Sequence, residues 1–137
     1  MWRSYALLSA LFAGLTAVLA KFGLQGISSN IATAIRTLVI LVIAWGIVFA
    51  GGETKDLQAL TKKHLLFLTL SGMATGLSWI FYFKALSTGP VSKVAPIDKL
   101  SVAIAIALSA IFLKESLDYK TIAGAVLIMA GTIVLIR

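Results

Sequence analysis

Five long apolar stretches follow one another along the chain and leave little sequence for anything else. Each is close to the length that an α-helix needs to cross a bilayer core of about 30 Å. Backbone polar groups in lipid need internal hydrogen bonds, and the stretches are too long for barrel strands. The sequence therefore predicts an all-α integral membrane protein with five transmembrane helices: Ser4–Ala20, Ala32–Ala50, Leu65–Phe83, Val94–Leu113 and Thr121–Ile136.

The composition agrees with a membrane protein and argues against several other classes. The 137 residues are 60% hydrophobic and only 12% charged, which is far from the balance of a soluble domain. The net charge of +7 does not indicate a nucleic-acid partner, because the basic residues stand singly near helix ends and form no patch. No cysteine is present, so no disulfide can form. We expect one transmembrane domain over residues 1–137.

The basic residues are divided evenly between the two ends of the predicted helices. Five helices place the N and C termini on opposite sides of the membrane. An excess of Lys and Arg normally marks the cytoplasmic side. Here neither side has an excess, so nothing forces every copy into one orientation. One side holds Arg3, Lys55, Lys62, Lys63, Lys114 and Lys120, and the other holds Lys21, Arg36, Lys84, Lys93, Lys99 and Arg137.

A different count remains open. Arg36, Lys84 and Lys99 can be assigned to the helices themselves rather than to their ends. The remaining tally is uneven and predicts an N-terminus inside the cell. The partner would then be a different chain of opposite orientation.

The start of the fourth apolar stretch carries the most unusual polar residues. Pro96 fits the first turn of a helix, where its missing N–H is not needed. Asp98 would then lie in that first turn, where the helix dipole favours an anion, and Lys99 would lie where it disfavours a cation. Adjacent residues on a helix point about 100° apart, so we expect no good ion pair between these two. Either the pair marks a polar binding site, or Asp98 caps the helix and Lys99 reaches the lipid headgroups.

Polar and aromatic residues also recur on one face of the third stretch. Thr75, Trp79 and Tyr82 follow helical spacing. Aromatic side chains with polar tips suit a cavity for amphipathic molecules. The alternative is an aromatic belt at the membrane interface. Tyr82 is close to the helix end and fits the belt better than Trp79 does.

No pattern indicates an enzyme, a metal site or a cofactor. The single histidine, His64, lies at a boundary between loop and helix, and one histidine makes no metal site. Arg36 could face a cavity, but its place near a helix start favours contact with headgroups. If transport is coupled to protons, Asp98 is the candidate, because no other acidic residue lies in the predicted helices.

Nearly the whole chain resembles a known family, most strongly from Gly72 to Gly131. The segments are Gly76–Leu86, Gly89-Pro90, Val94–Ser101, Phe112–Glu115, Gly124-Ala125 and Ala130-Gly131. They are similar to an EamA-type domain of the drug/metabolite transporter superfamily. Most members of that family fuse two such domains, of inverted topology, in one ten-helix chain. The resemblance implies export or exchange of small metabolites or drugs through a central cavity lined mainly by helices 1, 3 and 4.

Together these observations predict half of a ten-helix inverted-repeat transporter. Two copies of opposite orientation would form an antiparallel homodimer in a prokaryotic cell membrane, with alternating access around a shared cavity. An accessory subunit that pairs with another chain, and a flippase for lipid-linked substrates, are the alternatives. Partners are a small-molecule substrate and membrane lipid. The candidate substrate-binding residues are Trp79, Tyr82, Asp98, Lys99, Ser101, Thr75, Phe12 and Thr16, with Ser9 as a weaker candidate.

Overall fold

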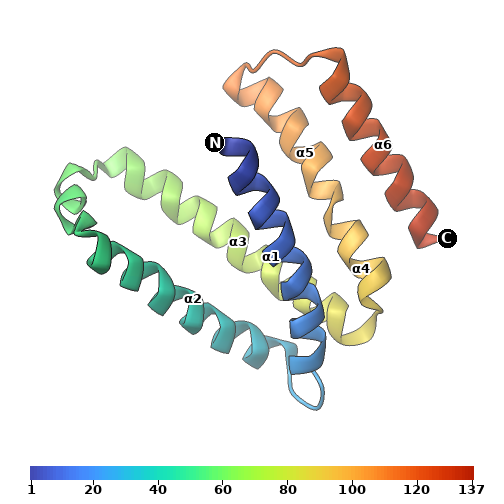
Figure 1. The fold of residues 1–137 in the computed structure, drawn as a ribbon, viewed down its shortest axis with the longest axis horizontal. Helices are drawn as coiled ribbons and strands as arrows, with labels where there is room; N and C mark the ends of the chain where they lie inside the picture. Colours follow the sequence, from blue (N-terminus) through green and yellow to red (C-terminus); the bar gives the residue numbers. More distant parts are fainter. The chain divides into compact units, whose positions relative to one another are not determined.

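The protein is helical over almost its whole length in a computed structural model that describes residues 1–137. It has five helical segments long and apolar enough to cross a membrane, and the fourth consists of three consecutive elements, α4, α5 and η2. This confirms the predicted all-α class and the five candidate spans. The elements in chain order are α1 (Trp2–Gly23), α2 (Ser29–Gly51), the 3₁₀ helix η1 (Glu53–Ala59), α3 (Lys62–Thr88), α4 (Val91–Asp98), α5 (Leu100–Leu108), the π-helix η2 (Ser109–Leu113) and α6 (Tyr119–Ile136) (Figure 1).

The helices begin earlier or end later than the apolar stretches that predict them. Helix α3 is the clearest case, since it has 27 residues and begins at Lys62 rather than Leu65. At 1.5 Å per residue it is about 40 Å long, which exceeds the hydrocarbon thickness. Hydropathy marks only the part of a helix that suits lipid. The helix itself can continue beyond that part, and it ends where its terminal N–H and C=O groups are satisfied by a cap or by water.

Local hydrogen bonds explain where several of these helices begin and end. Ser28 is the N-cap of α2, and its side chain accepts a hydrogen bond from the backbone N–H of Asn30 at 3.3 Å. Gly52 ends the same helix with φ 68°, the left-handed conformation that glycine adopts without strain. Asp118 is the N-cap of α6 and accepts a 2.9 Å hydrogen bond from the backbone N–H of Thr121. Each cap satisfies a backbone group that the helix leaves unpaired.

The chain divides into two compact units. One contains residues 1–18 and 88–137, and in it α6 packs along both α4 and α5. The other contains residues 19–87. There the Lys21 ammonium donates a 2.6 Å hydrogen bond to the carbonyl of Leu86, which joins the end of α1 to the end of α3. Leu24, Phe83 and Leu86 are buried in this second unit. The expected single domain over residues 1–137 stays a prediction.

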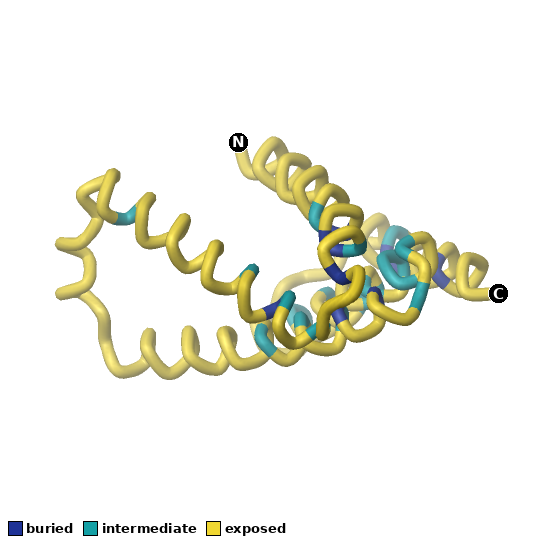
Figure 2. The backbone as a smooth tube through the Cα atoms, turned by 90° about the horizontal axis from the view of Figure 1, so that it is seen from below, coloured by how far each residue is buried: buried dark blue, intermediate teal, exposed yellow.

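Very few side chains are covered by the rest of the chain. Only six hydrophobic residues are buried, three of them alanines. Large apolar side chains are exposed along most of every helix (Figure 2). In water such a surface would aggregate, whereas lipid or another membrane helix can cover it.

The cap of α6 yields a pH-dependent prediction. Hydrogen bonds from the Thr121 hydroxyl and backbone N–H lower the pKa of Asp118 below its ordinary value of 3.8. A carboxylate with a lowered pKa in the fold stabilises it at pH values above the ordinary pKa, and this contribution disappears as the pH falls through the lowered value. We expect Asp118→Ala to reduce the melting temperature in detergent at pH 7 and to match the unsubstituted protein below the lowered pKa.

Asp118→Asn is the control, because asparagine also caps helices but carries no charge. Its melting temperature relative to that of Asp118→Ala should not depend on pH in this range. A difference between the unsubstituted protein and Asp118→Ala that persists at the lowest pH would contradict this account of the cap.

Candidate functional site

The fourth span is interrupted at Lys99, between α4 and α5. Pro96 is the sixth residue of α4, so its nitrogen cannot donate to the carbonyl of Ser92, one turn earlier. Lys99 adopts φ −70° and ψ −10°, and its N–H donates to the carbonyl of Pro96 at 3.0 Å. That bond spans three residues and tightens the last turn. A new helix then begins at Leu100. The break therefore lies within a membrane span rather than at its start.

The expectation that Pro96 and Asp98 lie in the first turn of this helix is wrong. Pro90, in an extended conformation with ψ 143°, is the N-cap, and α4 begins at Val91. Two prolines precede the apolar core of this span, and the helix begins after the first of them. Asp98 is the last residue of α4, and Lys99 separates it from the start of α5 at Leu100. The dipole of α4 therefore does not favour the anion, as it would at the start of that helix.

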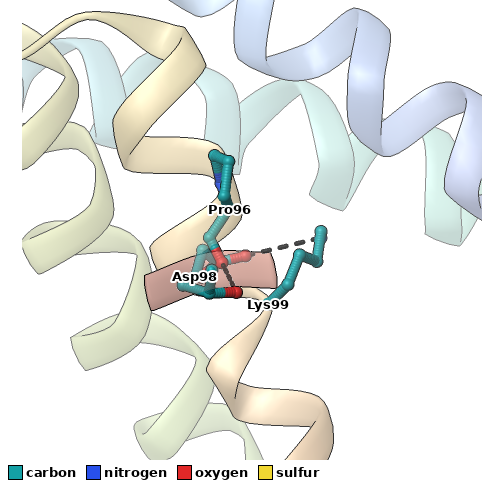
Figure 3. A network of polar contacts seen from close by, with 4 residues as sticks. Pro96, Asp98 and Lys99 are labelled. Atoms are coloured by element: carbon teal, nitrogen blue, oxygen red, sulfur yellow. Dashed lines mark hydrogen bonds and ion pairs between the residues drawn. The ribbon is translucent and has the colours of Figure 1, made fainter. Parts of the chain in front are cut away.

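Asp98 and Lys99 also pair with each other, contrary to the expectation from an uninterrupted helix. Their Oδ2 and Nζ atoms are 3.5 Å apart, and both side chains are partly exposed (Figure 3). The pair lies at the tightened turn around Lys99, whose backbone stays in the right-handed helical region. An ion pair reduces the cost of placing two charges in a membrane span.

Thr132 of α6 connects that helix to the break. Its hydroxyl lies 3.2 Å from the carbonyl of Pro96 and 2.9 Å from the carbonyl of Ile128 in its own helix. Thr132 is only 3% exposed. Beside it, an open groove of about 420 Å³ is lined by α4 and α6 and includes Pro96, Lys99 and Thr132. The break thus combines a charged pair, a carbonyl shared by two donors and an apolar groove.

A second polar group lies in residues 19–87, where Arg36 of α2 contacts the aromatic face of α3. The guanidinium carbon is 4.3 Å from the Phe83 ring centroid and 5.5 Å from that of Trp79. Its Nη1 atom is buried and has no hydrogen-bond partner. Trp79, which the sequence singles out, is therefore half-buried against a cation. Arg36 is absent from the predicted site residues, because its place near a helix start suggests contact with headgroups.

The other predicted residues have less distinctive surroundings. Thr75 is exposed, and its hydroxyl donates to the carbonyl of Ser71 at 2.9 Å. Tyr82 is half-buried and makes an edge-on contact with Phe83. Ser101 and Phe12 are exposed, and Thr16 is half-buried. Whether these side chains bind substrate stays a prediction.

A second groove in residues 88–137 has no polar character. It has a volume of about 400 Å³ and lies between α5 and α6, lined only by aliphatic side chains such as Ile104, Leu117 and Met129. Such a surface suits lipid tails or another helix better than a polar solute. None of the predicted site residues lines it.

Five helical segments long and apolar enough to cross a bilayer define an integral membrane protein. The family model for the EamA-like transporter family matches residues 1–137. The chain belongs to this family, which confirms the resemblance seen in its sequence. It is accordingly a membrane transporter by family, and nothing in that family assignment points to an enzyme.

Two curated relatives agree with this assignment. The chain is 46% identical, over 98% of its length and 95% of the relative's, to a Sinorhizobium protein described as an uncharacterized transporter in the cobO 3′ region. It is 32% identical, over 81% of its length and 74% of the relative's, to an uncharacterized protein of Methanocaldococcus jannaschii. No solved structure matches the chain.

The hydrogen bond from Thr132 to Pro96 can be tested against a matched threonine. Thr37 also donates to the carbonyl four residues earlier, at 2.8 Å, but the structure records no bond from it to another helix. Interhelical hydrogen bonds in membranes contribute on average about 0.6 kcal/mol. We expect Thr132→Val to lower the free energy of unfolding by about this amount more than Thr37→Val does. Unfolding in mixed detergent micelles measures both, and equal losses would contradict the role of Thr132 at the break.

Proposed function

We propose that the protein exports or exchanges small metabolites or drugs across a prokaryotic cell membrane, as an antiparallel homodimer with alternating access. The observation that carries the proposal is how few side chains each of the two compact units buries within itself. A ten-helix transporter built from two inverted five-helix halves would cover much of the remainder. The even distribution of basic residues supports insertion in both orientations.

The break at Lys99 supports a substrate site in the fourth span. Transporters often bind substrates where a helix is discontinuous, because free helix ends and unpaired carbonyls can contact a polar group. Here Asp98 and Lys99 supply one charge of each sign beside such ends. In the proposed dimer each copy contributes this segment and the Trp79 face to a central cavity. Asp98 is then the group that would carry a proton if export is proton-coupled.

The Sinorhizobium relative is a chain of similar size. Because the match covers 95% of that relative, it too has about the length of one five-helix unit. The competing hypothesis is an accessory subunit that needs a different, oppositely oriented chain. A flippase for lipid-linked substrates is a further alternative, and the purely aliphatic groove between α5 and α6 is the feature that favours it.

Flux from liposomes tests this function and its site residues. The purified protein is reconstituted with a mixture of metabolites and drugs inside, and their release is followed by mass spectrometry. We expect Trp79→Ala and Lys99→Ala each to reduce release about tenfold, the equivalent of roughly 1.4 kcal/mol, with little effect on insertion. Trp79→Phe retains a ring and Lys99→Arg retains the ion pair, so both should keep most of the flux.

Lys120→Ala is the control in the first turn of α6, where the side chain lies over Tyr119, and we expect unchanged flux. Normal flux in both alanine variants would contradict the proposed cavity. A well-folded protein that releases no solute of any class would favour the accessory-subunit hypothesis.

A further inference from the structure

Arg36 is a cation inside a membrane span for which the chain provides no counter-charge. It is the eighth residue of α2, about 10 Å along the helix from Ser29. The acidic residues of segment 19–87 are Glu53 and Asp56, both in η1 beyond the far end of α2. About 22 Å of helix separates Arg36 from that end. Asp98, the acidic residue within the other spans, is paired with Lys99.

The surroundings of Arg36 fix its guanidinium rather than neutralise it. Phe83 and Trp79 present ring faces at 4.3 and 5.5 Å, and they lie one helical turn apart on α3. Ring faces attract a cation, but they accept none of its N–H groups in a hydrogen bond as an oxyanion does. Nη1 is buried and has no acceptor. A guanidinium with an unused donor can bind a carboxylate or phosphate, whose oxygens match its planar fork of N–H groups.

We propose that Arg36, held by Trp79 and Phe83, binds the oxyanion of the transported molecule, which is therefore a small carboxylate or phosphate with an apolar body. This inference deepens the proposed function and rests on it, because it takes the bound molecule to be the one that is transported. The same chemistry is offered by the phosphate of an anionic lipid headgroup. The site therefore recognises an oxyanion, and the source of that oxyanion is an outcome of the test.

The fluorescence of Trp79 provides a direct test that needs no flux. The chain has three tryptophans, so Trp2→Phe and Trp45→Phe leave Trp79 as the reporter. In phosphatidylcholine nanodiscs this variant is titrated with cyclohexanecarboxylate, with cyclohexanecarboxamide and with inorganic phosphate. The acid and the amide differ in charge but hardly in shape. We expect a saturable change with the acid, and an affinity for the amide at least tenfold weaker.

Substitutions at Arg36 assign the effect to the guanidinium. Arg36→Gln should weaken binding of the acid at least tenfold, and Arg36→Lys should weaken it less, since lysine keeps the charge without the planar pair of donors. Arg3→Gln is the control: it removes one arginine at the chain terminus, which in the unsubstituted protein lies over the Trp2 ring. It should leave binding unchanged. If Arg36→Gln fails to fold, as judged by circular dichroism, Arg36→Lys still separates charge from geometry.

A lipid arm distinguishes the source of the oxyanion. Nanodiscs of phosphatidylglycerol replace those of phosphatidylcholine. If they alter Trp79 emission and suppress binding of the acid, and Arg36→Gln abolishes both effects, the oxyanion that Arg36 binds is a lipid headgroup. If they do not, the soluble acid is the ligand class. An equal response to acid and amide, or no Arg36-dependent response to the acid, phosphate or phosphatidylglycerol, overturns the proposal. Binding without any flux would instead contradict the transport function and leave the site standing.

Discussion

The membrane is the constraint on which the rest of this structure depends. The five spans satisfy their own backbone hydrogen bonds as helices, but they bury only a few side chains against one another. Lipid can cover apolar side chains as well as protein can, so the hydrophobic effect does not hold such helices together. What remains are close packing and a small number of polar contacts. For this reason the few polar contacts between helices determine much of the local architecture.

Those contacts have different forms. Thr132 bonds to the carbonyl of Pro96 at a helix break, and Lys21 bonds to the carbonyl of Leu86 at a helix end. Arg36 lies over the ring faces of Trp79 and Phe83. Of these groups, only Arg36 has a buried donor without an acceptor. Proteins that bind polar solutes keep such a group available, because a bound ligand can then supply the missing acceptor. A structural contact has its hydrogen-bond donors already paired within the protein, whereas a binding residue keeps a donor unpaired.

The spans were predictable from the sequence, because a long apolar run has one stable solution in lipid. The sequence also singles out Trp79, which lies well inside an apolar run at helical spacing from Thr75 and Tyr82, and its role in binding stays a prediction. The break at Lys99 was not predictable. Pro96 fits either the first turn or the interior of a helix, and only the start at Val91 decides between them. Arg36 was missed because a count of charges along the chain does not say which neighbouring helix a side chain faces.

The central claim is that one five-helix unit is completed by an inverted copy, and the mass of linked copies tests it most directly. Five spans put the termini on opposite sides, so two copies joined end to end insert in opposite orientations. One extra apolar helix between them makes the orientations equal. The molar mass in detergent is measured by light scattering. The direct tandem should have the mass of one tandem chain, because its two halves pair with each other. The tandem with the extra helix should have the mass of two tandem chains. The reverse result, with the direct tandem associating and the parallel one remaining single, would contradict the claim.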